Sequence, residues 1–562
     1  MNMLTLFSKK APNALFISII FGALAGILYS SLIPLVLSSI SPEDPNFTNK
    51  IELTTEVLSF NVSNYKMAAL FFVTCVSILV MRSVSQIILV RVAAKVGKDL
   101  RSQFYERIIS SSLLSVENIG SSRLIASIST DIPRIVSGAG ALPSILVNSI
   151  TLIGMLGFLI FINFEVFKLV MLAIFVGGVC FQLPMSIGNK MLEKSRETRD
   201  ELQRSIHGLI YGFKELKLDK KNREFYFEKA LLDNERKILK DEKSAYSIIT
   251  MMGIFGDLIS FFVIGAVCFV FISYHTISSQ ELVGVIMALL YITGPISVLL
   301  DTIPRMVVAS ISHRKLNKLL ASIPVETDVK TVSDTPEWET IQLKNVEYTY
   351  PSKREEAGFS VGPINITLKK GDVTFLVGAN GSGKSTLSKL LTLHYLPKNG
   401  VISFGEESLG LNNIESYRQK IGAIYSDYFL FDTFLFDIDG ERLARANTYL
   451  KMLELDAKVN IVDGRFSTLS LSDGQKKRMA LLVSLMIDKE VYLFDEWAAD
   501  QDPVFKDIFY NKILPELKAK NKVIIVISHD DRYFHIADKT IVMESGKVRA
   551  ENESLIKQLE PA

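Results

Sequence analysis

The fold of the C-terminal half is decided by one stretch of nine residues, Gly378-Ala379-Asn380-Gly381-Ser382-Gly383-Lys384-Ser385-Thr386. A short strand pattern, Val373–Val377, precedes it, and a helix pattern, Leu387–Leu393, follows it. The spacing G-x-x-x-x-G-K-[ST] between a strand and a helix predicts a phosphate-binding loop. Its glycines let backbone N–H groups wrap phosphate oxygens, and the following helix directs its positive N-terminus at them.

Two side chains of this loop are expected to act on a nucleoside triphosphate directly. Lys384 supplies a positive charge to the β- and γ-phosphates, and the hydroxyl group of Ser385 suits Mg²⁺. We therefore expect residues 378–386 to bind ATP together with Mg²⁺, and we assign Lys384 to the catalytic group as well.

A second apolar strand pattern, Val491–Phe494, ends in two acidic residues. Asp495 is placed to hold the metal ion through water, and Glu496 is placed to accept a proton from the attacking water molecule. Two acids at the end of a strand can also be ordinary loop residues. Their order after the phosphate loop favours the catalytic interpretation.

Two further motifs are weaker when each is taken alone. The turn Leu471–Gln475 opens a basic helix, and Ser472, Gly474 and Gln475 are expected to bind an anion at its N-terminus. His529 follows the strand pattern Val523–Ile527, at the carboxyl end where sites of α/β proteins form. We assign His529 to the catalytic group, although a single histidine at such a place is often structural.

Long apolar runs fill the first three hundred residues, and the chain has a mean hydropathy of +0.28. A membrane core of about 30 Å needs about 20 helical residues. Six runs reach this length, at approximately residues 14–40, 67–90, 141–162, 169–189, 248–273 and 282–300. The first run is longer than the apolar part of a signal peptide, so we expect it to be an uncleaved span.

The charges of the connections predict the orientation of these spans. An even number of spans places both ends of the chain on one side. The connection at residues 41–65 holds one lysine and four acids, whereas the connection at residues 190–247 is rich in lysine and arginine. Because Lys/Arg-rich connections stay in the cytoplasm, we expect the N-terminus and the C-terminal half to be cytoplasmic.

Two long inner segments, at about residues 95–134 and 190–243, show helical periodicity with mixed charge. This pattern predicts that the spans continue out of the membrane as amphipathic helices. Two turns within them, near Val116–Arg123 and Gly208–Leu218, are expected to contact a cytoplasmic domain. Hairpins that are merely solvated are the alternative.

Polar groups within the spans are candidates for contact with a transported substrate. Such groups are costly in a membrane and tend to face a cavity or a partner. The candidates are Asn148, Gln182, Asp257 and Asp301. Asp257 and Asp301, together with Arg305, can also lie at span ends, where charge costs little.

The overall charge excludes one class of partner. The net charge is +2, from 62 basic and 60 acidic residues, so no global field favours nucleic acid.

The three cysteines, Cys75, Cys180 and Cys268, each lie in an apolar run. They offer neither a disulfide framework nor the spacing of a metal site.

The motifs and spans together resemble an ATP-binding-cassette transporter of the fused exporter type, over essentially the whole chain. The resemblance implies a six-helix transmembrane domain of the type-1 exporter fold at residues 1–323, a linker at 324–340 and an α/β P-loop nucleotide-binding domain at 341–562. Residues 378–386 then form the Walker A loop, 491–496 the Walker B strand and 471–475 the signature. The resemblance also makes His529 the switch histidine, residues 499–502 the D-loop, and Tyr350 the aromatic that stacks on adenine.

The sequence departs from the usual family pattern at two positions, and other residues indicate which branch of the family it resembles. Asp473 stands where the signature usually has glycine, and Ser426 stands where glutamine is expected in the Q-loop, which leaves the metal contact there in doubt. The runs at residues 494–503 and 528–534 resemble the bacterial branch that exports cyclic peptides, including lipopeptides, pyoverdine-type siderophores and microcins. This resemblance implies ATP-driven export of a peptide-like substrate across the inner membrane.

The single set of cassette motifs predicts assembly within the lipid bilayer. In this family the signature of one cassette closes over the Walker A loop of another, which implies a homodimer or a heterodimer with a similar half-transporter. Two other functions remain alternatives, because they share every motif discussed. They are a multidrug or lipid flippase and an importer built on the exporter fold. The six predicted spans argue against a soluble ATPase. The presence of both Glu496 and His529 argues against a membrane sensor that binds nucleotide without hydrolysing it.

Overall fold

The computed structural model describes residues 10–39, 55–57, 60–62, 65–271, 278–326, 335–351 and 358–552. The chain divides into two compact units. The first, here called the helical unit, comprises Met1–Phe104 and Ile125–Leu320. The second, the sheet unit, comprises Tyr105–Leu124 and Ala321–Ala562.

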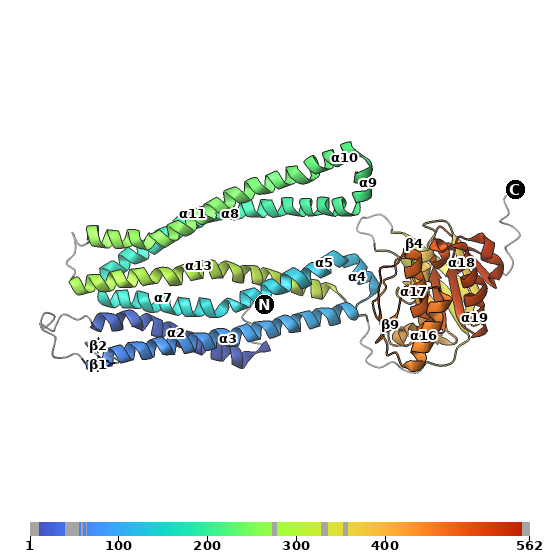
Figure 1. The fold of residues 1–562 in the computed structure, drawn as a ribbon, viewed down its shortest axis with the longest axis horizontal. Coiled ribbons are helices and arrows are strands. Elements are labelled where there is room, and N and C mark those ends of the chain that lie inside the picture. Colours follow the sequence, from blue (N-terminus) through green and yellow to red (C-terminus); the bar gives the residue numbers. More distant parts are fainter. Residues whose placement is uncertain are drawn as a thin grey trace. The chain divides into compact units, whose positions relative to one another are not determined.

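Long helices make up the helical unit (Figure 1). They are α2 (Pro12–Ser39), α3 (Tyr65–Ile109), α6 (Ile132–Gly140), α7 (Leu142–Ile162), α8 (Phe164–Tyr211), α11 (Asp233–Gly265) and α13 (Ser279–Ser322). Shorter elements join them: α9 (Phe213–Leu218), α10 (Lys220–Phe225) and the π-helical segments η1 (Ser127–Asp131), η2 (Tyr226–Leu232) and η3 (Ala266–Phe271). Helix α5 (Ser121–Ala126) contains the boundary between the two units.

Five helical stretches in the described part are long and apolar enough to cross a membrane. They are Pro12–Leu37, Tyr65–Ile109, Ser121–Ile162, Phe164–Tyr211 and Glu281–Ser322. Four of them contain one of the spans that the apolar runs predict, and Pro12–Leu37 covers most of the first predicted span, 14–40. The remaining predicted span, 248–273, overlaps α11 and η3 as far as Phe271, where Phe261–Phe271 forms a shorter apolar helix, and its last two residues lie outside the described part.

Small residues let these helices approach closely. A Cβ added at Gly154 would lie 2.5 Å from the Oγ of Ser30, and one added at Gly138 would lie 2.2 Å from the Cβ of Ala309. Such contacts fit helices that associate through backbone proximity in lipid. The packing therefore depends on glycine at these crossings between α2 and α7 and between α6 and α13.

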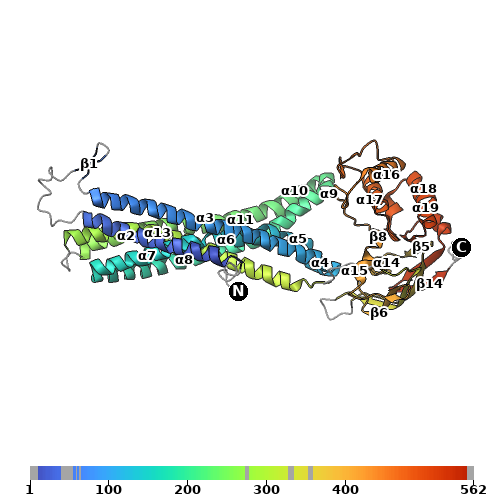
Figure 2. The same cartoon turned by 90° about the horizontal axis from the view of Figure 1, so that it is seen from below.

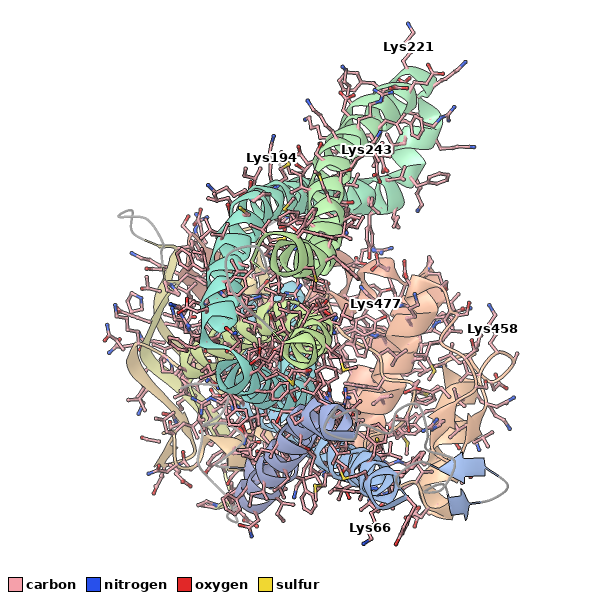
Figure 3. All side chains as sticks on the ribbon, turned by 90° about the vertical axis from the view of Figure 1, so that its left-hand side faces the viewer. Lys66, Lys194, Lys221, Lys243, Lys458 and Lys477 are labelled. Atoms are coloured by element: carbon pink, nitrogen blue, oxygen red, sulfur yellow. The ribbon has the colours of Figure 1, made fainter. Side chains whose placement is uncertain are left out.

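Helices α8 and α11 pair as a long hairpin that α9, α10 and η2 close (Figure 1). The continuation of the spans as helices beyond the apolar runs is thus confirmed for α3 and α8. On the hairpin, the carboxylate of Glu242 accepts a hydrogen bond from Ser195 at 2.9 Å and pairs with Arg199. Figure 3 shows Lys194, Lys221 and Lys243 along this basic hairpin.

One pair of strands in the helical unit was not predicted. Strands β1 (Thr55–Val57) and β2 (Phe60–Val62) pair antiparallel within the connection between α2 and α3. The alternation in this short stretch is too brief to be read as a strand pattern.

Two main sheets organise the sheet unit. The larger has the order β14-β13-β5-β12-β11-β8, with β14 antiparallel at one edge and the other five strands parallel. Its strands are β5 (Val373–Gly378), β8 (Ile421–Ile424), β11 (Val491–Asp495), β12 (Val523–Ile527), β13 (Lys539–Glu544) and β14 (Lys547–Asn552). Strands β11 and β12 are buried at every position, as expected for parallel strands covered on both faces.

The smaller sheet is antiparallel, with the order β4-β3-β6-β7. Its strands are β3 (Thr340–Thr349), β4 (Ser360–Lys369), β6 (Asn399–Phe404) and β7 (Glu407–Ser408), and β9 (Ile461–Val462) pairs separately with β10 (Arg465–Phe466). The helices of this unit are α4 (Leu113–Ile119), α14 (Lys384–Leu391), α15 (Ile414–Arg418), α16 (Gly440–Met452), α17 (Asp473–Ile487), α18 (Pro503–Ile508) and α19 (Leu514–Ala519), with the turns η4 (Trp497–Asp500), η5 (Phe509–Ile513) and η6 (Asp531–Ile536). Figure 2 shows α16 to α19 on one side of this unit and β6 on the other.

The elements that the sequence predicts around the motifs are present. The three strand patterns at residues 373–377, 491–494 and 523–527 are β5, β11 and β12, and the basic helix after residue 472 is α17. Helix α14 begins at Lys384, three residues before the predicted start, because the phosphate loop turns directly into it. The phosphate loop, Glu496 and His529 thus follow the carboxyl ends of β5, β11 and β12 in the larger sheet, whereas the signature turn begins α17, which precedes β11 in the chain.

Candidate nucleotide-binding site

The phosphate loop connects β5 to α14 through a backbone that only glycine tolerates. Gly378 and Gly383 have φ values of +150° and +104°, which residues with a side chain rarely adopt. A Cβ at Gly378 would also lie 2.3 Å from the carbonyl oxygen of Met543 on β13. The glycines therefore allow the loop to fold tightly over the end of the sheet.

A lysine and a serine are buried in this loop. The Nζ of Lys384 donates to the carbonyl oxygens of Gly378 at 2.7 Å and Ala379 at 3.1 Å. Burial lowers the pKa of Lys384, and two nearby carboxylates oppose this shift. The hydroxyl oxygen of Ser382 is buried without a hydrogen-bond partner among the described residues. A buried cation beside an unsatisfied hydroxyl group fits a phosphate ligand.

The predicted catalytic pair comes together at the ends of two neighbouring strands. Strands β11 and β12 are parallel and adjacent, so the residues that follow them meet. Glu496 follows β11 in a left-handed conformation with a φ of +51°. The Nε2 of His529, which follows β12, lies 3.3 Å from the Oε1 of Glu496. The two side chains can therefore act on one ligand.

Asp495 and Ser385 are the residues that could hold Mg²⁺. Asp495 is buried, and burial together with the charge of Glu496 raises its pKa, while a hydrogen bond from the backbone of Ser426 opposes the rise. No three His, Cys, Asp or Glu side chains cluster in the described part of the chain. One carboxylate and one hydroxyl group fit Mg²⁺, which is commonly held by few protein ligands and by substrate phosphates. When bound, the ion neutralises charge on the phosphates.

At the Q-loop position the chain uses its backbone rather than a long amide side chain. The backbone of Ser426 contributes the hydrogen bond to Asp495. The hydroxyl group of the preceding residue, Tyr425, is hydrogen-bonded to Thr392 and lies 3.1 Å from the Nδ1 of His394. Burial raises the pKa of Tyr425 to about 12. These bonds fix the loop next to Asp495.

Tyr350 lies beside the helix that carries the phosphate loop. Its hydroxyl group is 3.1 Å from the Oγ1 of Thr386, and its ring packs edge-on against Tyr348 and Tyr395. Residues 352–357, which follow closely, are outside the described residues. This position next to the loop supports the adenine contact, which stays a prediction.

The signature turn is held by its own side chains. The Oγ of Ser472 accepts a hydrogen bond from the amide of Gln475 at 3.4 Å, and the Oε1 of Gln475 accepts one from the amide of Ser472 at 3.2 Å. This reciprocal cap starts α17, which has 15 residues. The side chains of Ser472 and Gln475 therefore shape the turn that presents the positive end of α17, a role that the motif alone did not indicate.

The sheet unit includes one turn from the membrane half. The predicted contact of the turn near residues 116–123 is confirmed, because α4 belongs to this unit. The carboxylate of Glu117 accepts hydrogen bonds from the Nζ of Lys389 at 2.8 Å and the hydroxyl group of Tyr395 at 2.6 Å. Burial raises the pKa of Glu117, but these partners outweigh it and hold the pKa below its usual value. Lys389 lies on α14, so α4 contacts the phosphate-loop helix itself.

Sequence reasoning missed Glu117 because no motif distinguishes it from other acids of the same segment. The second predicted turn, near residues 208–218, belongs to the helical unit. It carries exposed apolar side chains at Phe213 and Leu218.

A cavity of about 230 Å³ in the helical unit bears on the predicted substrate residues. Its walls are mainly apolar side chains of α8, α11 and α13, with Asp301 among them. Asp301 pairs with Arg305 at 2.8 Å. Asn148 donates a hydrogen bond within its own helix, and Gln182 is exposed; neither lines this cavity. The side chain of Asp257 is outside the described part of the structure.

Comparison with known proteins agrees with this geometry. Residues 13–296 match the family of the ABC transporter transmembrane region, and residues 361–499 match the ABC transporter family. The ATP-binding protein SyrD of Pseudomonas syringae pv. syringae is 31% identical over 459 residues, which cover 80% of this chain and 81% of that protein.

Two more distant relatives share parts of the chain. A probable ABC transporter ATP-binding/permease protein of Haemophilus influenzae is 26% identical over 64% of this chain and 66% of its own length. The alpha-hemolysin translocation ATP-binding protein HlyB of Escherichia coli O157:H7 is 30% identical over 37% of this chain and 30% of its own length. The chain therefore belongs to the ABC transporters, as a multi-pass, ATP-hydrolysing membrane protein in which an exporter-type transmembrane region is fused to its ATP-binding domain.

Proposed function

We propose that two copies of this chain form an exporter that moves a peptide-like compound across the bacterial inner membrane, with ATP hydrolysis in shared sites driving alternating access. The transmembrane domain, residues 1–323, provides the passage, and the linker 324–340 joins it to the nucleotide-binding domain. The domain at 341–562 lies in the cytoplasm together with the N-terminus. A dimer with a similar half-transporter is the alternative assembly.

The observation that carries the shared site is an open hollow at the catalytic pair. This hollow of about 280 Å³ is lined by Glu496, His529 and residues of the segments 498–506 and 527–532. The side chains of Glu496 and His529 are 39% and 48% exposed. Phosphoryl transfer is favoured when bulk water is excluded from the reacting groups. A second sheet unit can cover the site and bring the positive end of its own α17 to the phosphates.

Each residue of the site then has a role that its position supports. Glu496 takes the proton of the attacking water molecule, and His529 holds the carboxylate of Glu496 in place. Lys384 and the amides of residues 378–386 hold the phosphates, and Asp495 with Ser385 holds Mg²⁺. Ser472, Gly474 and Gln475 approach from the partner chain, and Tyr350 contacts the adenine.

The substrate class rests on weaker support. The name of the relative HlyB states the translocation of alpha-hemolysin, and the residues around Glu496 and His529 resemble those of peptide and siderophore exporters. The apolar cavity with Asp301 in its wall suits a compound that combines apolar and polar groups. Export of lipids or of unrelated drugs, and import, are the competing outcomes of the tests.

A crosslinking experiment tests the shared site. Ser472→Cys and Ser382→Cys are introduced in a chain that lacks Cys75, Cys180 and Cys268 and carries Glu496→Gln to block turnover. A ligand stabilises whichever state binds it better, so a crosslink between chains should form only with ATP. Ser472→Cys with Lys458→Cys is the matched control and should not crosslink. Crosslinks within one chain, or crosslinks that form equally without ATP, contradict the proposal.

Direction and substrate need separate measurements. In the same cysteine-free background, a cysteine at Asn46 should react with a membrane-impermeant reagent from outside spheroplasts, whereas one at Lys220 should not. Inside-out vesicles should then accumulate a cyclic lipopeptide when ATP is added. The reverse labelling pattern would overturn the orientation, and accumulation of labelled phospholipid in place of the peptide would favour a flippase.

A further inference from the structure

A lysine of the signature helix contacts the catalytic strand end. Lys477 on α17, labelled in Figure 3, is only 7% exposed. Its Nζ donates to the backbone carbonyl oxygen of Glu496 at 3.1 Å and pairs with the carboxylate of Asp500 at 2.7 Å. The lysine therefore holds the residue that acts as the base and the turn that follows it.

Two further hydrogen bonds join the same two segments. The indole Nε1 of Trp497 donates to the carbonyl oxygen of Lys477 at 2.8 Å. The Nε2 of Gln501 donates to the carbonyl oxygen of Gly474 at 3.1 Å. The first turns of α17 and the segment 496–501 are thus bonded to each other at several points and can be expected to move together.

A buried ammonium group is costly unless it is paired and hydrogen-bonded. The partners of Lys477 are a carboxylate whose side chain is 60% exposed and a carbonyl of a residue in the left-handed conformation. Removing the ammonium group would remove the hydrogen bond to the carbonyl oxygen of Glu496, while the bonds of Trp497 and Gln501 to α17 would remain. The contact therefore does more than fill space in the core.

We propose that Lys477 is a positioning residue that couples the two ATP sites of the dimer. This inference rests on the proposed shared sites. In that assembly the turn at residues 472–475 closes over the partner's nucleotide, whereas Glu496 acts on the nucleotide of its own chain. Lys477 connects these two elements within one chain, so closure at one site aligns the base of the other.

The neighbours of Lys477 provide matched controls on the same helix. Lys476 is 41% exposed at its side chain and pairs with Asp473 at 3.5 Å. Arg478 is buried like Lys477, but its guanidinium group binds the carbonyl oxygen of Leu453 at 3.0 Å and lies 3.7 Å from the ring centroid of Phe505. Arg478 therefore serves as the control for a buried cation on α17 that has only a structural role.

Mixed dimers, purified through two different tags, test the proposal. One chain is otherwise wild type and the other carries Glu496→Gln, so that only one site hydrolyses ATP. Lys477→Met is placed either on the chain that supplies the active Glu496 or on the chain that supplies the signature to that site. We expect kcat to fall about tenfold in both placements, while the KM for ATP changes less than about twofold, because the nucleotide contacts are intact.

The controls separate this role from stability. Lys476→Met should leave kcat unchanged in both placements. Arg478→Met should lower Tm and leave kcat per folded dimer within about threefold. If Lys477→Met impairs folding, Asp500→Asn replaces it, and the smaller loss of about threefold should again appear in both placements.

A loss confined to the chain that carries Glu496 would overturn the coupling and leave Lys477 a local support. No loss in either placement would overturn it as well. Failure of the shared site itself is detected separately, by placing Ser472→Arg on the Glu496→Gln chain. If hydrolysis then continues at the other chain, the proposed dimer is wrong irrespective of Lys477.

Discussion

The two units place large apolar side chains differently: the sheet unit buries phenylalanines that the helical unit exposes on its surface. In the sheet unit Phe375 and Phe494 are fully buried, whereas in the helical unit Phe161 is 89% exposed and Phe269 is 83% exposed. Large apolar side chains on an outer surface are tolerated when the surrounding medium is lipid. Each unit therefore suits a different solvent, water for the sheet unit and lipid for the helical unit, which agrees with the family assignment.

Polar groups differ between the units in a related way. In the sheet unit charged groups gather where β11 and β12 end, around one open hollow. In the helical unit the buried Asp131 pairs with Lys315 at 3.0 Å and with the hydroxyl group of Ser312 at 3.2 Å, which joins η1 to α13. Buried charge thus serves chemistry in one unit and a contact between helices in the other.

The largest effect is expected where the sheet unit carries its chemistry. Glu496→Gln should keep ATP binding but reduce steady-state hydrolysis about 10²–10⁴-fold, because a general base contributes that much. Hydrolysis and ATP binding of the purified variant are compared with those of wild type. Glu544→Gln, at an exposed side chain that ends β13 of the same unit, is the control. A rate within about threefold of wild type would remove Glu496 from the catalytic role.

Truncating an apolar side chain should have different effects in the two units. Phe375→Ala should destabilise the sheet unit by about 3–5 kcal/mol, because it leaves a cavity in a packed core. Phe161→Ala should change Tm much less, because an exposed side chain leaves no cavity. Thermal unfolding of the full chain in lipid nanodiscs measures both. Equal shifts for the two variants would contradict a lipid-facing position of Phe161.

The third prediction concerns Glu117 on α4, in the segment Tyr105–Leu124 that belongs to the sheet unit. Glu117→Gln should lower stability by about 1 kcal/mol, since hydrogen bonds to a charged group at a partly exposed position contribute this much. For a unit of this size that is about 2–4 °C in Tm. Glu106→Gln, an exposed acid of the same segment, is the control.

The effect at Glu117 should depend on pH in one direction. The pKa of Glu117 is lowered in the folded chain, so its stabilisation is present above the ordinary glutamate pKa of about 4.3. It is lost as the pH falls through the lowered folded value. The Tm difference between wild type and Glu117→Gln should therefore shrink below about pH 4. A difference that grows in acid would contradict the ion pair with Lys389.

How much the sequence predicts also differs between the units. Strands β5, β11 and β12 and the loop at residues 378–386 follow from local patterns, because each depends on neighbours in sequence. The meeting of Glu496 and His529 follows from the topology of parallel strands. The site is therefore predictable from the sequence, because its residues lie in local motifs and the order of the parallel strands brings them together.

Contacts made between distant segments could not be predicted in this way. Glu117 reaches Lys389 across 272 positions of sequence, and nothing in the pattern of either residue marks the pair. The capping role of Ser472 and the bonds of Lys477 likewise depend on which segments the fold brings together. In the helical unit, lengths and charges predict spans, but which side chains line a cavity depends on packing, so Asn148 and Gln182 lie outside the cavity wall and their contact with a substrate stays a prediction.

The smallest expected effect tests whether Asp473 hinders closure over the nucleotide. Its side chain is 90% exposed at the start of α17 and lies 3.5 Å from the Nζ of Lys476. Two like charges about 4 Å apart in water interact by about 1 kcal/mol, so Asp473→Gly should lower the Mg·ATP concentration for half-maximal crosslinking by up to about fivefold.

An acid at a helix N-terminus also stabilises the helix by about 0.3–1 kcal/mol, so Asp473→Gly carries a small stability cost that could mask the gain. Asp473→Asn separates the two effects, because it removes the charge and keeps the side chain. If repulsion is the cause, Asn and Gly should lower the Mg·ATP requirement alike, and the difference from wild type should shrink as salt screens the charge. A requirement that falls only with glycine would assign the effect to backbone freedom in the signature turn, and an unchanged requirement would show that Lys476 already neutralises Asp473.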